Sequence, residues 1–154
     1  GYIYNQLKTD YSSLQGEMLS YQSEVNEQIN SIQDSLIKSS GELEFLLDES
    51  TETILLAGTE LSPDSKVRLF WNKTTKEYVI QYGNLPAAAA GTQYQLWAIA
   101  DGKPVDMGVL NKSEESTQKE AIQLENIEAF AITLEKEGGS EVPTLEAMYV
   151  VGAV

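Results

Sequence analysis

The sequence contains neither cysteine nor histidine among its 154 residues. Their absence excludes disulfide bonds, zinc sites of the usual Cys/His type, thiol nucleophiles and every Ser-His or Cys-His dyad. A lack of disulfides is compatible with an envelope location but does not require one, because the β region is large enough to bury its own core. We therefore expect a protein that is not an enzyme, with no cofactor and no catalytic, cofactor-binding or metal-ligating residue.

Basic residues and long apolar runs are also scarce. Lys and Arg number 10 against 24 Asp and Glu, which gives a net charge of -14. This negative field repels a phosphate backbone, so we expect no nucleic-acid partner. No stretch approaches the roughly 18 consecutive apolar residues of a membrane span, and the first residues lack a secretory leader. The chain is therefore either cytoplasmic or a piece whose targeting segment lies outside it.

The many carboxylates form pairs that are close in sequence. Two carboxyl groups roughly 5 to 10 Å apart can act as general acid and base, as they do in glycosidases. Chance pairs are common in a chain this rich in Glu, so solvated surface is the favoured interpretation. The pairs are Asp48-Glu49, Glu114-Glu115 and Glu135/Glu137.

Calcium is a minor alternative to catalysis, because carboxylates supply the hard oxygen ligands that it prefers. The candidate ligands are Asp101 and Asp106, or Asp48, Glu49 and Glu52. No D-x-D-x-D-G loop is present, so we assign no metal site.

Residues 1–40 contain no Pro, and their only glycines are Gly1 and Gly16. Apolar side chains recur there in steps of three and four, at Tyr4, Leu7, Tyr11, Leu14, Met18, Tyr21, Val25, Ile29, Ile32 and Leu36. This heptad pattern, with one additional step of four between Val25 and Ile29, predicts a coiled-coil helix. Such a helix is about 60 Å long, longer than the remaining domain is wide, so we expect a weak parallel homodimer.

An alternative is that the apolar stripe folds back on the chain's own β region, as amphipathic helices commonly do. Tyr at three seam positions is less than ideal for a tight two-stranded zipper. Gly16 costs roughly 1 kcal/mol relative to Ala in a helix interior, which also weakens a rod. The sequence leaves both arrangements open.

After Ser39-Ser40-Gly41, a predicted helix stop, the apolar period changes from about 3.5 to 2. Candidate strands follow, separated by turn-forming Gly, Pro, Asn and Asp. They span residues 43–48, 52–57, 66–71, 77–82, 93–100, 105–110, 121–124, 129–135 and 146–151. We therefore predict a mainly β fold, with a helical coiled-coil stalk over 1–40 and an antiparallel, immunoglobulin-like β-sandwich over 41–154.

The run YQLWAIADGKPVDMG, residues 94–108, is typical of a central strand followed by a hairpin. Both faces of residues 93–100 are partly apolar, so we expect Tyr94 and Trp97 to be core anchors. Asp101-Gly102 favours a type I′ turn, and the polar residues 73–76 are expected to form another hairpin loop. Alternation in two further strands predicts core positions at Val67, Leu69, Trp71, Tyr78, Ile80 and Tyr82.

Two features near the end of the chain are interpreted as turn devices. Gly138-Gly139 allows positive φ after the strand that ends near Glu135, and Pro143 ends ladder pairing before the last strand. A double Gly can also cradle an anion, but Lys136 is the only cation nearby and acidic residues surround it.

Several short motifs, in order, resemble the C-terminal domain of the anti-sigma-K factor family over roughly residues 66–152. Each motif is weak alone, but the order LP, YQLW, G-x-PV-x-x-G and ITLE-x-x-GGS-x-x-PT is specific. The matching residues are Asn84-Leu85-Pro86, Gly91, Tyr94-Gln95-Leu96-Trp97, Gly102, Pro104-Val105, Gly108, Ala131-Ile132-Thr133-Leu134-Glu135, Gly138-Gly139-Ser140 and Pro143-Thr144. The run Ala87 to Ala90 and the Tyr- and Gln-rich helical lead-in depart from the usual pattern.

The resemblance implies a non-catalytic, extracytoplasmic (periplasmic) regulatory or sensor domain of a single-pass inner-membrane anti-sigma factor. In this interpretation a cytoplasmic domain, absent from this chain, holds an extracytoplasmic-function sigma factor, and residues 1–40 are the stalk after a membrane span. An envelope protease or another envelope protein is an expected partner. The alternative is an envelope β-sandwich module that binds a glycan or protein on a coiled-coil stalk, and a hydrolase is a distant third.

Overall fold

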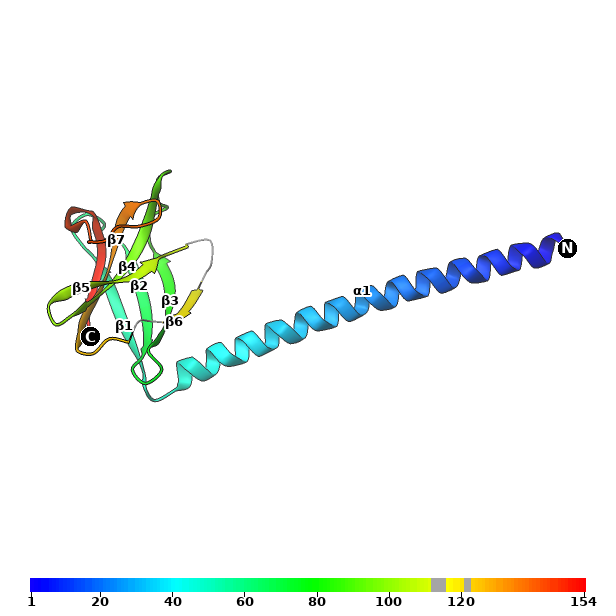
Figure 1. Ribbon diagram of the computed structural model, residues 1–154, viewed down its shortest axis with the longest axis horizontal. Helices are drawn as coiled ribbons and strands as arrows, with labels where there is room; N and C mark the ends of the chain where they lie inside the picture. The colour runs from blue at the N-terminus through cyan, green and yellow to red at the C-terminus, as the bar shows by residue number, and fades with distance from the viewer. Residues whose placement is uncertain (112–115, 121–122) are drawn as a thin grey trace. The chain divides into compact units, whose positions relative to one another are not determined.

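The computed structural model describes residues 1–111, 116–120 and 123–154, with the backbone alone for 116–120. The chain divides into two compact units, Gly1–Phe45 and Leu46–Val154. The first unit is helical and the second is an antiparallel sheet (Figure 1). The prediction of a long N-terminal helix followed by a mainly β region is therefore confirmed.

Helix α1 spans Tyr2–Leu47, 46 residues, and is about 69 Å long at the standard rise. The predicted stop at Ser39-Ser40-Gly41 is wrong, and the strand predicted over 43–48 is helix up to Leu47. Ser and Gly each cost at most about 1 kcal/mol in a helix interior. No proline blocks the helix, and good helix formers follow at residues 42–47, so the helix continues through this weak point.

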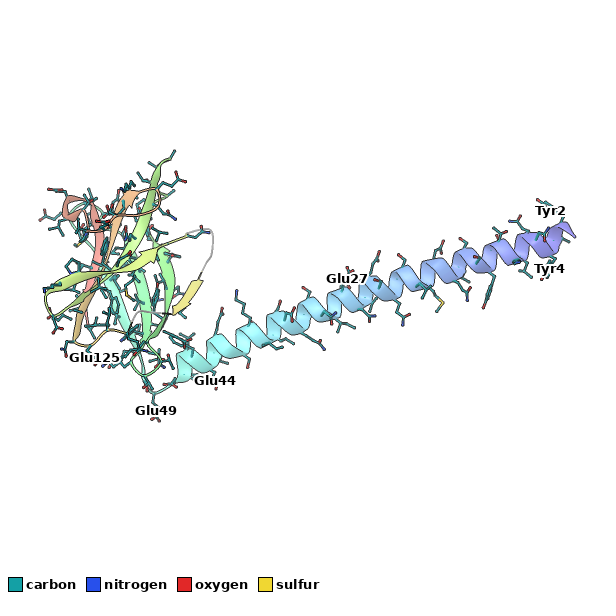
Figure 2. The ribbon with its side chains drawn as sticks, in the orientation of Figure 1. Tyr2, Tyr4, Glu27, Glu44, Glu49 and Glu125 are labelled. Carbon is teal, nitrogen blue, oxygen red and sulfur yellow. The ribbon has the colours of Figure 1, made fainter. Side chains whose placement is uncertain are left out.

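The apolar seam of α1 is open to solvent. Every seam residue from Tyr4 to Leu36 except the half-buried Val25 is exposed, and Figure 2 shows side chains standing out along the helix from Tyr2 to Glu44. Because the helix extends to Leu47, the seven-residue spacing continues from Leu36 to Leu43, which is also exposed. In the part of the chain that the structure describes, no helix has the length and apolar character of a membrane span.

Eight strands are present among the described residues. They are β1 Thr51–Gly58, β2 Lys66–Asn72, β3 Glu77–Asn84, β4 Thr92–Ala100, β5 Lys103–Val109, β6 Ser116–Glu120, β7 Ile127–Lys136 and β8 Met148–Ala153. The short 3-10 helix η1, Leu145–Ala147, precedes β8, so the last strand starts later than predicted. Strand β6 was not predicted. Of the strand expected at 121–124, residues 121–122 lie outside the described residues and 123–124 are not in a strand.

The described strands form one continuous antiparallel sheet in the order β5-β4-β7-β8-β1-β2-β3-β6. The predicted two-sheet, immunoglobulin-like sandwich is therefore not confirmed. The sheet curls around its core. This is seen from the hydroxyl of Tyr78 on β3, which donates a hydrogen bond to the carbonyl of Met107 on β5 at 3.1 Å. Strands near opposite ends of the sheet order thus meet.

The concave face of the sheet holds the hydrophobic core. Five of the six predicted core positions on β2 and β3 are buried, and the sixth, Tyr82, is partly buried and packs against them. The rings of Trp71 and Phe130 pack together with their centroids 5.7 Å apart. Of the two expected core anchors, Tyr94 belongs to this core, whereas Trp97 is buried on the opposite face of the sheet. Asp101 and Gly102 have φ of 50° and 72°, as the predicted type I′ turn requires.

Candidate functional site

The outer face of β4 and β7, opposite the core, carries buried side chains. Gln95 lies across from Thr133, and Gln93 lies across from Glu135. Because side chains alternate along a strand, these residues point away from the face that carries Tyr94 and Leu96. Gln95 and Thr133 are nevertheless only 1% and 0% exposed. The segment of residues 137–147, between β7 and β8, therefore covers this part of the sheet.

Hydrogen bonds join this segment to the sheet. We use the term polar cluster for the side chains and backbone groups that make these bonds and their immediate neighbours. Its members are Gln95, Trp97, Asp106, Thr133, Glu135, Ser140 and Thr144.

Gln95 fastens the first half of the segment. Its Nε2 donates to the carbonyl of Ser140 at 3.0 Å, and its Oε1 accepts from the Ser140 N–H at 2.8 Å. Nε2 also donates to Asp106 Oδ1 at 2.7 Å, and the same oxygen accepts from the N–H of Gly108. Both hydrogens of the amide are thus used, so the buried side chain has no unsatisfied donor.

Glu135 fastens the second half. Its Oε1 accepts from the Thr133 hydroxyl at 2.5 Å and from the Thr144 N–H at 2.7 Å, and its Oε2 accepts from the Thr144 hydroxyl at 2.8 Å. The Thr133 oxygen in turn accepts from Trp97 Nε1 at 2.9 Å. A continuous chain of hydrogen bonds therefore runs from the indole of Trp97 to the segment before η1.

The carboxyl group of Glu135 stays ionised although it is 3% exposed. Burial alone would raise its pKa, but hydrogen bonds from Thr133, from the backbone and side chain of Thr144 and from Ser140 lower the pKa below the ordinary value of 4.5. Its oxygens are occupied by donors of the chain itself. The arrangement holds a loop in place and offers no free carboxylate to act as a general base.

The double glycine lets the segment turn onto the sheet. Gly138 and Gly139 have φ of 86° and 87°, so the expected need for positive φ is confirmed. A Cβ on Gly139 would lie 2.9 Å from both Gln95 Oε1 and Val109 Cγ1, whereas a Cβ on Gly138 would meet nothing within 4 Å. Gly139 is therefore required for close approach as well as for backbone conformation.

On the core side of β4, Tyr94 makes a second tie. Its hydroxyl donates to the carbonyl of Pro86 at 2.9 Å, and its ring meets Tyr149 edge-on with centroids 5.3 Å apart. Burial raises the pKa of Tyr94 to about 12, so the hydroxyl remains a proton donor at neutral pH. The loop after Leu85 is thereby attached to the core.

Most candidate ligands and acids from the sequence are engaged separately in local contacts. Asp48 Oδ1 accepts from the Ser50 N–H, Glu52 pairs with Lys73 at 2.6 Å, and Asp101 Oδ1 accepts from Asn126. Glu49 and Glu137 are exposed, and Glu114-Glu115 lies outside the described residues. Among the described residues, no group of three or more acidic side chains could hold a metal ion.

The prediction that the acidic pairs are solvated surface is wrong for Glu135. Its pairing with Glu137 was interpreted as solvated surface, but Glu135 is buried and only Glu137 is exposed. Polar residues on one face of a strand usually indicate that the face is exposed to solvent. The sequence pattern does not show that residues 137–147 fold back over this face. The one available signal was Trp97, a large side chain on the same face as Gln95.

The fold and the polar cluster define a class of protein. It is a curled antiparallel β domain that follows a long helix, and buried hydrogen bonds hold the segment of residues 137–147 on its sheet. A family model described as anti-sigma-K factor rskA, C-terminal, matches residues 32–148, more than half of the chain. The chain belongs to this family, and the resemblance found over residues 66–152 is confirmed. The match begins earlier than expected, within α1. No curated protein matches the chain, and no solved structure does.

Proposed function

We propose that the chain is the extracytoplasmic regulatory domain of a single-pass membrane anti-sigma factor that controls an extracytoplasmic-function sigma factor. The family match over residues 32–148 is the observation that carries this proposal. The Glu135 carboxylate of the polar cluster is engaged by donors of the chain itself, which also supports a role without catalysis. The sigma factor is held by a cytoplasmic domain of the same protein, outside this chain.

In this proposal α1 is the stalk between a membrane span and the β domain. Its exposed seam supports pairing with a second copy as a coiled coil, because 46 helical residues with an apolar stripe gain stability when the stripe is covered. A homodimeric stalk would hold two membrane spans together and control the access of an envelope protease. Release of the sigma factor would follow from that cleavage.

A second candidate function is an envelope binding module for a protein ligand. The observation that favours it is the apolar tip of the segment 137–147, where Val142 and Leu145 are 71% and 68% exposed. The polar cluster holds this segment in place, and a preorganised loop loses little entropy when it binds. Both functions can belong to one sensor domain.

The experiment measures sigma-dependent transcription and sigma-factor binding in cells that produce the protein carrying this domain. Deleting residues 46–154 should change the response of sigma-dependent transcription to envelope stress, while the sigma factor still copurifies with the remaining protein. The purified 154-residue chain should not bind the sigma factor. Unchanged transcription after the deletion, or direct binding of the sigma factor to the purified chain, would contradict the proposal.

A further inference from the structure

The apolar seam of α1 has different chemistry on its two flanks. Acidic residues precede every second seam residue in the N-terminal half, at Asp10, Glu17 and Glu24, spaced by seven. On the other flank, Lys8, Gln15 and Gln22 follow Leu7, Leu14 and Tyr21, also spaced by seven. All six flanking residues are exposed, and Gln15 and Gln22 line a shallow hollow on the seam with Tyr11, Leu14, Met18 and Leu19.

Beyond the additional step of four between Val25 and Ile29, the pattern is mixed. Gln33 follows the seam residue Ile32 and Glu42 precedes the seam residue Leu43, but Gln28 and Ser35 precede Ile29 and Leu36. Asp10 also accepts a hydrogen bond from Gln6 Nε2 at 3.2 Å, which leaves its second oxygen available to another donor. In the N-terminal half, one side of the seam is therefore acidic, and the other carries amides and Lys8.

These flanks correspond to the g and e positions of a coiled coil, which meet across the interface. In a parallel pair in register, g of one helix faces e of the next heptad in the other. Asp10 then faces Gln15 of the second copy and Glu17 faces Gln22 of the second copy, so that each acid meets an amide donor. In an antiparallel pair aligned over its full length, g faces g, so Asp10 would face Glu42 of the second copy and repel it.

We propose that α1 binds α1 of a second copy in parallel and in register, and that these acid–amide pairs select this orientation. The occupant of the seam is thus this chain itself. Its Tyr2 ends lie side by side in the pair, as do its Leu47 ends. The inference rests on the self-association within the proposed function, and it adds the register and the residues that determine the parallel orientation.

A charge substitution tests the orientation, because its effect differs between the two arrangements. In the double variant Gln15→Lys/Gln22→Lys, a parallel pair gains four acid–lysine contacts, two from each helix. An antiparallel pair gains none, because lysines would then face the amide flank of the other helix. The control Ser12→Lys/Ser23→Lys adds the same charge away from the seam and therefore reports the relief of overall acidic repulsion.

Sedimentation equilibrium of the full 154-residue chain at low salt measures the dimer dissociation constant. The seam-flank variant should dimerise about tenfold more tightly than its control, a factor expected from four exposed ion pairs. The difference should shrink in high salt. Equal or weaker dimerisation of the seam-flank variant would overturn the proposed orientation.

Because the chain has no cysteine, single-cysteine variants give a direct second readout. Leu7→Cys and Leu43→Cys should each form a disulfide-linked dimer alone under mild oxidation, since equal positions meet in a parallel pair. Disulfides that form only when the two variants are mixed would indicate antiparallel pairing and overturn this inference alone. A chain that stays monomeric at high concentration would overturn both the inference and the self-association in the proposed function, but not the regulation of a sigma factor.

Discussion

Replacing Glu135 by glutamine tests whether the polar cluster stabilises the domain through a buried charge. The carboxylate accepts hydrogen bonds from Thr133 and Thr144 at 2.5, 2.7 and 2.8 Å. The amide has nearly the same shape but no charge and only one accepting oxygen. Hydrogen bonds to charged groups contribute about 1.5 to 3 kcal/mol and neutral ones about 0.5 to 1.5 kcal/mol. We therefore expect Glu135→Gln to lower the free energy of unfolding by about 1 to 3 kcal/mol at pH 7.

The effect of this substitution should depend on pH with a definite sign. The pKa of Glu135 is lowered in the folded state, so its ionised form stabilises the fold at pH values above the ordinary pKa of 4.5. That contribution is lost as the pH falls through the lowered, folded-state pKa. The difference between the wild type and Glu135→Gln should be complete at pH 7 and should shrink on acidification below 4.5.

Urea unfolding followed by tryptophan fluorescence measures both quantities, because Trp71 and Trp97 are buried in the native state. Glu137→Gln is the matched control, since it removes the same charge from an exposed residue and should change stability by less than about 0.5 kcal/mol. Glu135→Gln as stable as the wild type at pH 7 would refute the reasoning. So would a difference that stays constant down to pH 3.

Two further predictions concern close packing and the curl of the sheet. Gly139→Ala should destabilise the domain by about 2 to 3 kcal/mol, because positive φ is combined with a methyl group placed 2.9 Å from Gln95 and Val109. The control Gly138→Ala should cost only about 1 kcal/mol, because it has the positive φ without the close contact. Equal effects of the two substitutions in thermal unfolding would show that close approach is unimportant. Tyr78→Phe should lower the free energy of unfolding by about 1 to 2 kcal/mol, because it removes the hydroxyl that joins β3 to β5. No loss of stability in urea titrations would argue against that bond as a closure of the sheet.

Local periodicity was enough to predict most elements but not the end of the helix. The seven-residue spacing predicted α1, and alternation predicted the core positions on β2 and β3. Ser39-Ser40-Gly41 was interpreted as a stop because each residue is a poor helix former. The helix continues because the cost of three poor residues is distributed over a long helix with good helix formers on both sides.

Strand order and the polar cluster depend on contacts that sequence periodicity does not encode. Strand β8 lies between β7 and β1, so strands from the two ends of the domain are neighbours, and a side-chain hydrogen bond joins β3 to β5. Strand β6, sequence STQKE, has no apolar alternation and pairs with β3 through its backbone. Glu135 and Gln95 are polar residues on an outer face, and only the return of residues 137–147 buries them.

The location of the domain outside the inner membrane is the central claim, and a single introduced cysteine tests it most directly. Val142 is 71% exposed, and the chain has no cysteine of its own, so Val142→Cys gives one defined labelling site within this domain, and the full-length protein without the substitution is the control. In cells that produce the full-length protein, this cysteine should react with a membrane-impermeant maleimide while the inner membrane is intact. Labelling that appears only after the inner membrane is broken would contradict the account.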